Sequence, residues 1–100
     1  AAIAGMTRAM AWSLGPKGVR VNAICPALVR TEIVDAAMQD PNQAAQFRRY
    51  NPEGTVTTVD EIGALAVFLL SDAGAALNGA EVMADRAMSA LLDVFDARRD

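Results

Sequence analysis

Histidine is absent from the sequence, and cysteine, lysine and tyrosine each occur once. With no histidine and a single Cys25, a metal site of the Cys/His kind is excluded, and so is an internal disulfide. A lone cysteine within an apolar stretch usually packs as a small hydrophobic residue. The net charge is −3 and the basic residues are scattered. This argues against nucleic acid as a partner, because a nucleic-acid surface needs a basic stripe.

Long hydrophobic runs are missing as well. The longest one, Ala64–Leu70, is far too short to cross a bilayer, and no stretch has the charged and apolar regions of a signal peptide. We therefore expect a cytoplasmic protein with no membrane partner. Apolar residues nevertheless make up 53% of the chain, above the usual ~45–50%. In 100 residues, which allow one domain at most, this surplus indicates a piece of a larger core or an oligomer.

The stretch 19–31 is the most informative part of the sequence. Its apolar side chains fall on both faces of a strand: Val19, Val21, Ala23 and Cys25 on one face and Ile24 on the other. This pattern is typical of a parallel sheet covered on both sides. The strand should end at Pro26, which cannot donate to a neighbouring strand. Ligands of open α/β sheets bind just beyond such strand ends, so the turn that leads to the hydroxyl of Thr31 is a candidate site.

Helical patterns account for most of the remaining chain. We expect helices at about 1–14, 32–38, 41–49, 59–70 and 87–99, and a second strand at 81–85. Asp40 before Pro41 predicts a capped helix start, and Thr58 with Glu61 predicts a capping box. The helix at 59–70 is apolar around most of its circumference. It should therefore be buried nearly all round, within this chain or, as we favour, against another one.

Four of these segments, in this order, resemble the short-chain dehydrogenase/reductase family. Residues 19–31 are similar to its Val-Asn-x-x-x-Pro-Gly-x-x-x-Thr segment, with Ala27 in place of the glycine. Residues 1–14 resemble the second half of its catalytic helix, residues 57–72 its Thr-Pro-Glu-Glu-Ile … Phe-Leu-Leu-Ser-Asp helix, and residues 78–85 its last strand. The resemblance covers about residues 1 to 90. It implies an α/β fold, namely the carboxyl-terminal part of a doubly wound Rossmann-like parallel sheet: the last two strands plus helices.

Several motifs of that family are missing. No three glycines have the spacing of its Gly-x-x-x-Gly-x-Gly cofactor loop, and Tyr50 and Lys17 do not form its Tyr-x-x-x-Lys pair. The resemblance therefore describes residues 1–100 as a partial Rossmann-like domain that lacks the amino-terminal nucleotide-binding half. It assigns no catalytic residue, because the catalytic Ser, Tyr and Lys have no counterpart here. The family's Gly-Gly after the last strand is Arg86-Ala87, and we expect a different turn, because neither residue readily adopts positive φ.

The resemblance implies a function and a set of cofactor contacts. The family transfers hydride between a nicotinamide, NAD or NADP, and an alcohol, a ketone or an acyl thioester. Pro26 and Ala27 correspond to the turn beneath the nicotinamide, Val29 to the residue whose backbone holds the carboxamide, and Thr31 to a hydroxyl donor. Taken without the resemblance, Thr31 before Glu32 is typical of a helix N-cap, and the two roles can coexist. The region 32–50 corresponds to the substrate lid, in which Phe47 and Tyr50 either pack or touch substrate.

Other interpretations of the sequence stay open. The chain, inactive alone, is either part of such an oxidoreductase or a non-enzymatic truncated product. In the second case it would pack onto a full-length relative through the 59–70 helix. An unrelated helix-rich binding module is a third possibility. In the first two cases a homo-oligomer or a full-length relative is the expected partner, and no metal is expected. The substrate and the choice between NAD and NADP are not encoded in any motif present.

Overall fold

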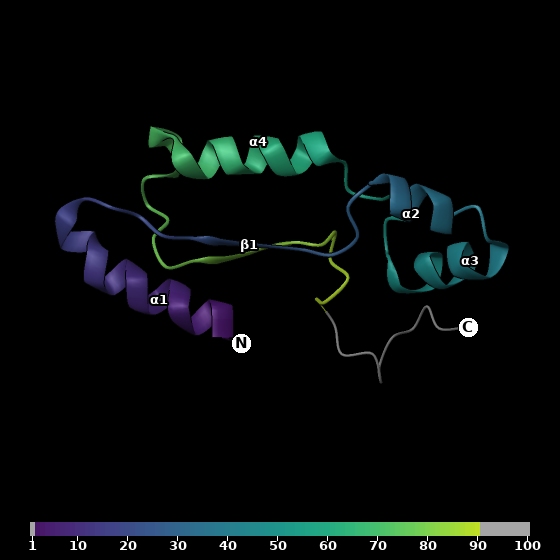
Figure 1. Ribbon diagram of the computed structural model, residues 1–100, viewed down its shortest axis with the longest axis horizontal. Coiled ribbons are helices and arrows are strands. Elements are labelled where there is room, and N and C mark those ends of the chain that lie inside the picture. Colours follow the sequence, from purple (N-terminus) through teal and green to yellow (C-terminus); the bar gives the residue numbers. More distant parts are fainter. Residues whose placement is uncertain (1, 91–100) are drawn as a thin grey trace.

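The chain forms helices around a small parallel sheet (Figure 1). The computed structural model describes residues 2–90. Its elements, in chain order, are α1 (Ala2–Leu14), a 3-10 turn (Gly15–Lys17), β1 (Ala23–Pro26), α2 (Glu32–Ala37), α3 (Pro41–Tyr50), α4 (Val59–Leu70), a second 3-10 turn (Asp72–Gly74) and β2 (Glu81–Ala84). In Figure 1, α1 and α4 flank the strands, and α2 and α3 lie together beyond the strands' carboxyl ends. The α/β fold class is confirmed.

The two strands pair in parallel, in the register Ala23–Glu81 to Pro26–Ala84. Parallel neighbours need a crossover connection, and here the crossover contains α2, α3 and α4. The strand ends at Pro26, as predicted from its missing N–H. Because both strands run the same way, their carboxyl ends meet at one edge, and the segments that follow them become neighbours.

The first strand begins later than the sequence suggests, at Ala23 instead of residue 19. Two asparagine side chains replace the ladder in the preceding segment. Asn78 Oδ1 accepts the N–H of Val21 at 3.0 Å, and Asn22 bonds through both ends of its amide to backbone groups just before β2. The N–H of Gly79 also donates to the carbonyl oxygen of Val21 at 2.7 Å, so amide side chains and a backbone bond together hold the two segments before the paired strands begin. Asn22 thus has a structural role.

Local sequence signals set the helix boundaries. Thr58 and Glu61 form both hydrogen bonds of a capping box at the start of α4. Asp40 caps α3 by accepting the N–H of Asn42 at 2.9 Å, and Pro41 is the first helical residue. Four of the five predicted helices thus lie within one or two residues of their expected limits. Of the fifth, expected at 87–99, the structure describes only the first residues, which form a turn at 87–89 and a bend at 90; residues 91–99 lie outside the described part of the chain.

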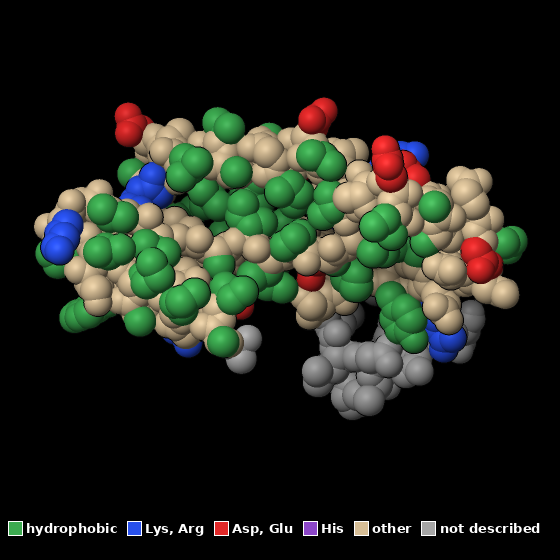
Figure 2. Space-filling view, viewed as in Figure 1, with side chains coloured by type: hydrophobic (Ala, Val, Ile, Leu, Met, Phe, Trp, Pro, Cys, Tyr) green, Lys and Arg blue, Asp and Glu red, His purple; other side chains and the backbone are tan. Residues whose placement is uncertain are grey.

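The prediction that α4 is buried nearly all round does not hold within this chain. Leu69 is buried, but Val67 is 67% exposed and Leu70 83% exposed. Two strands are too narrow to cover more than one side of the helix. On α1, apolar side chains including Met6 and Trp12 are exposed too. Figure 2 shows hydrophobic side chains gathered over α1 and between α1 and α4. Each helix therefore has exposed apolar side chains that the rest of residues 2–90 does not cover.

Candidate functional site

The predicted cofactor residues lie together just beyond the carboxyl end of β1. We call residues 26–31 the lip. Pro26 ends the strand, and Val29 forms an isolated parallel bridge with Thr57. The carbonyl oxygen of Thr57 accepts the N–H of Arg30 at 2.6 Å. The backbone of the lip is therefore held by the segment that precedes α4, at the edge of the sheet where ligands of such folds bind.

Thr31 caps α2, one of its two predicted roles. Its hydroxyl oxygen accepts the N–H of Val34 at 3.3 Å, and its backbone is extended. The side chain is exposed. A hydroxyl that accepts one bond can still donate its own hydrogen, so the cap leaves a donor for a carboxamide oxygen. Whether Thr31 serves a cofactor in this way stays a prediction.

Ala27, which stands where the resembled family has glycine, is half-buried. Its φ is not positive, since among the described residues only Arg86 and Ala87 combine a side chain with positive φ. The turn therefore does not need the conformational freedom of glycine at this position. The alanine methyl group is therefore compatible with the local backbone. It would affect cofactor binding only by steric contact with the cofactor.

A pocket of about 380 Å³ opens beside the lip. Its apolar lining includes Leu28 from the lip, Val34 and Met38 from the α2 region, Phe47 and Tyr50 from α3, and Met88. The lining residues carry no charge, and its polar side chains include the amides of Gln43 and Gln46. Phe47 is 7% exposed and Tyr50 45%. From the sequence, Phe47 and Tyr50 could either pack in the core or touch a substrate. In the structure both line this pocket: Phe47 is buried, and Tyr50 is exposed to solvent.

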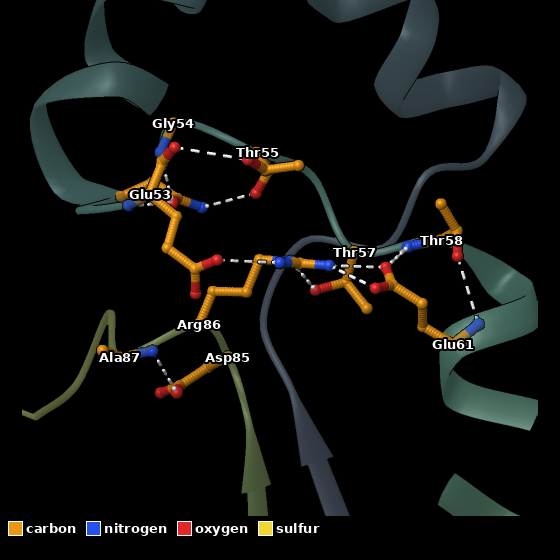
Figure 3. Close-up of polar contacts among 10 residues, drawn as sticks. Glu53, Gly54, Thr55, Thr57, Thr58, Glu61, Asp85, Arg86 and Ala87 are labelled. Atoms are coloured by element: carbon orange, nitrogen blue, oxygen red, sulfur yellow. Dashed lines mark hydrogen bonds and ion pairs between the residues drawn. The ribbon is translucent and has the colours of Figure 1, made fainter. Parts of the chain in front are cut away.

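Arg86, directly after β2, joins segments that are far apart in the sequence (Figure 3). Its guanidinium donates to Glu53 at 3.0 Å, to the hydroxyl of Thr57 at 3.1 Å, and to both carboxylate oxygens of Glu61 at 2.5 and 2.6 Å. We call these four residues the Arg86 cluster. Nη2 alone donates to both oxygens of Glu61, so this charge-assisted contact comes from one nitrogen. These bonds, with one from the N–H of Thr58, lower the pKa of Glu61 to about 2.

The turn that contains Arg86 contradicts the sequence-based expectation. Arg86 has φ 52° and Ala87 has φ 67°, so this turn adopts the left-handed backbone for which glycine would be the ordinary choice. Such a conformation costs about 1–2 kcal/mol for a residue with a side chain. Asp85 supports the turn, because its buried carboxylate accepts the N–H groups of Ala87 and Ser89. The pKa of Asp85 is lowered, mainly by the hydrogen bond from the hydroxyl of Ser89 and to a smaller extent by these two N–H groups.

Sequence reasoning missed the Arg86 cluster. Arg86 was noticed only as a departure from Gly-Gly, and its partners lie 25 to 33 residues earlier in the chain. The only signal in the sequence is the arginine that follows Asp85 where glycine is expected. This signal does not identify the residues that Arg86 contacts. The cluster lies next to the lip, because Thr57 of the cluster pairs with Val29 and accepts the N–H of Arg30.

Two further searches cover only the part of the chain that the structure describes. Within residues 2–90, no group of three or more acidic or cysteine side chains is arranged to hold a metal ion. In the same range, no helix has both the length and the apolar character needed to cross a membrane.

Comparison with known proteins gives consistent matches. The family model described as enoyl-(acyl carrier protein) reductase matches residues 1–89. D-threitol dehydrogenase of Mycolicibacterium smegmatis is 41% identical over 83% of this chain and 32% of its own length. Carbonyl reductase [NADPH] 2 of Sus scrofa is 31% identical over 80% of this chain and 33% of its own.

Solved structures agree with these sequence matches. A short-chain type dehydrogenase/reductase from Mycobacterium ulcerans superposes with a TM-score of 0.81 at 30% identity, over 87% of this chain and 32% of that one. The chain thus spans about a third of the length of the relatives that it matches.

Proposed function

Because the chain belongs to the short-chain dehydrogenase/reductase family, we propose that it forms the nicotinamide-binding lip and the substrate lid of an NAD(P)-dependent oxidoreductase. The observation that supports this most strongly is the lip at the carboxyl edge of the sheet, directly beside an uncharged pocket that Leu28 of the lip also lines. The reaction would be hydride transfer between the cofactor and an alcohol or ketone carbon, or an acyl thioester.

The residues of the lip suit a planar carboxamide. A threonine hydroxyl that is already fixed as a helix cap and a backbone held by Thr57 offer oriented polar groups. Bound there, the nicotinamide would supply or accept the hydride. Pro26 and Ala27 would support its ring, Val29 would meet the carboxamide through its backbone, and Thr31 would donate a hydrogen bond. Holding the ring in one orientation fixes the face from which hydride leaves.

The chemistry also needs a proton donor or acceptor and a group that binds the carbonyl oxygen. The family supplies these groups with Tyr, Lys and Ser side chains, and the 100 residues contain no counterpart of these three. We propose that the 100-residue chain alone is inactive, and that the nucleotide-binding half completes the site in an active enzyme. The uncharged pocket favours substrates whose reacting end carries no charge, because burial of an unpaired charge is costly. The proposal includes a cytoplasmic location.

Cofactor binding and turnover test this proposal. The protein is produced from its own gene at natural length and titrated with NADH and NADPH, following nicotinamide fluorescence, and the 100-residue chain is assayed separately for nicotinamide-dependent turnover of alcohols and ketones. We expect binding and turnover at natural length, and none by the short chain above a Thr31→Val control. Failure of the natural-length protein to bind either nucleotide refutes the oxidoreductase. Turnover by the short chain refutes the claim that it is inactive alone.

The second candidate function is non-enzymatic, in which the chain packs onto a full-length relative or a second copy. The uncovered apolar residues of α4 favour it, because Val67 and Leu70 are 67% and 83% exposed. Leu70→Glu should then shift the protein to a smaller assembly in light scattering. Ile33→Glu on α2 is the matched control, since Ile33 is also 83% exposed. If the two variants leave the assembly equally unchanged, α4 is not the contact.

A further inference from the structure

We propose that Arg86 is a positioning residue that fixes the lip and the α2–α3 lid relative to the end of β2. The proposal rests on the function assigned above to the lip. It adds a residue that lies outside the resembled motifs, at a position where the family has glycine. Arg86 would touch neither cofactor nor substrate, and would act through Thr57 on one side and Glu53 on the other.

The first step is the contact with the lip. The Nε of Arg86 donates to the hydroxyl of Thr57 at 3.1 Å, and Thr57 is only 7% exposed. The same residue bridges Val29 and accepts the N–H of Arg30 through its carbonyl oxygen. One residue therefore separates the guanidinium from the backbone that would meet the carboxamide. A shift of Thr57 moves the lip directly.

The second step is the contact with the lid. Nη1 of Arg86 binds Glu53 at 3.0 Å, in the segment that follows α3. This segment is braced by the buried Asn51, whose side chain accepts the N–H groups of Glu53 and Gly54 and donates to the carbonyl oxygen of Thr55. These bonds restrain the loop. Because the loop directly follows α3, a shift of Glu53 would also shift the end of α3, where Tyr50 lines the pocket.

The third step is charge. Glu53 and Glu61 both bind the guanidinium of Arg86, while the arginine side chain is 21% exposed. Without the cation, the two carboxylates would repel one another and the hydroxyl of Thr57 would lose its donor. A lysine would restore the charge but not the planar fork that reaches three groups. Left-handed backbone at a residue with a side chain persists where its surroundings hold it, and here those surroundings are the partners of Arg86 and the carboxylate of Asp85.

A second arginine supplies a matched control at the opposite end of the sheet. Arg20 precedes β1 and donates to the carbonyl oxygens of Ser71, Gly74 and Leu77, at 2.9 to 3.2 Å. It too ties distant segments together with several hydrogen bonds, but those segments lie before β2. Its loss should destabilise the fold without moving the lip.

The experiment compares Arg86→Met, Arg86→Lys and Arg20→Met in the natural-length protein. Amide hydrogen exchange is measured without cofactor, and the Kd for NADPH and NADH by fluorescence at a temperature where all variants are folded. We expect Arg86→Met to accelerate exchange at residues 29–31 and 51–57 and to raise the Kd for the cofactor about two- to twelvefold, as for the loss of one hydrogen bond between the lip and the carboxamide. Arg86→Lys should rescue only in part. Arg20→Met should leave both readouts unchanged.

The two readouts separate this proposal from the assigned function. If the unaltered protein binds neither nucleotide, the oxidoreductase is refuted, and exchange at 29–31 still decides whether Arg86 positions the lip. If the unaltered protein binds cofactor but Arg86→Met has unchanged exchange at 29–31 and unchanged Kd, the positioning role is wrong. Equal effects of Arg86→Met and Arg20→Met on Kd would also overturn it, because loss of stability alone would then explain the result.

Discussion

Replacing Thr31 by valine separates its two roles, helix cap and cofactor contact. Valine has nearly the same shape but no hydroxyl, so the N–H of Val34 loses its partner. Loss of an N-cap costs about 0.5–2 kcal/mol. The bond here is long, at 3.3 Å, and exposed, and bonds weaken with length. We therefore expect the free energy of unfolding to fall by about 0.5–1 kcal/mol.

The same change should weaken cofactor binding if the hydroxyl meets the carboxamide. A neutral hydrogen bond contributes a net ~0.5–1.5 kcal/mol, which corresponds to a Kd raised about two- to twelvefold. Thr31→Ser keeps the hydroxyl and should therefore retain most of the stability and most of the cofactor affinity of the unaltered protein. Thr7→Val is the matched control. It removes a threonine hydroxyl bond of 2.7 Å to the carbonyl oxygen of Ile3 within α1, a helix that precedes β1, and should leave Kd unaltered.

Urea titration gives the free energy of unfolding, and nicotinamide fluorescence gives Kd at 25 °C. A Thr31→Val protein that is less stable but binds cofactor like the unaltered one would leave Thr31 as a cap only. An unchanged free energy of unfolding would show that the cap bond contributes nothing. If Thr7→Val weakened cofactor binding as much as Thr31→Val, the effect would be general and the local reasoning refuted.

Two further predictions concern stability. In thermal melts, Gly74→Ala should destabilise by about 1–3 kcal/mol, because its Cβ would lie 2.5 Å from a backbone carbonyl oxygen. Gly5→Ala, in open space within α1, should stabilise by about 0.5–1 kcal/mol, and equal effects would refute the geometry. Folding lowers the pKa of Glu61 to about 2 from 4.5 and also lowers that of Asp85. Their contribution is therefore complete above pH 4.5 and is lost as the pH falls toward 2. Glu61→Gln should flatten this loss in acid titrations, and an unchanged slope would contradict the shift.

Local signals explain why much of the fold could be predicted from the sequence. The capping box of Thr58, the Asp40–Pro41 start of α3 and the end of β1 at Pro26 depend on interactions within a few residues, so their residue types are sufficient evidence. The position of the lip was predicted for the same reason, because it directly follows a recognisable strand, while its cofactor role stays a prediction. The family assignment also rests on short motifs in a fixed order. These can be recognised in the sequence without knowing how the chain folds.

Tertiary structure alone decided the rest. The partners of Arg86, the strand start at Ala23 and the exposure of Leu70 depend on which distant segments meet, and no residue type fixes that by itself. Arg86 takes up left-handed backbone because Glu53, Thr57 and Glu61 converge on its side chain from elements up to 33 residues away. Local preference favours glycine there, and the combined long-range bonds outweigh it. The sequence by itself thus determines the limits of α1 to α4 and the end of β1, while the path of the loops determines where strand pairing starts and which side chains share a site.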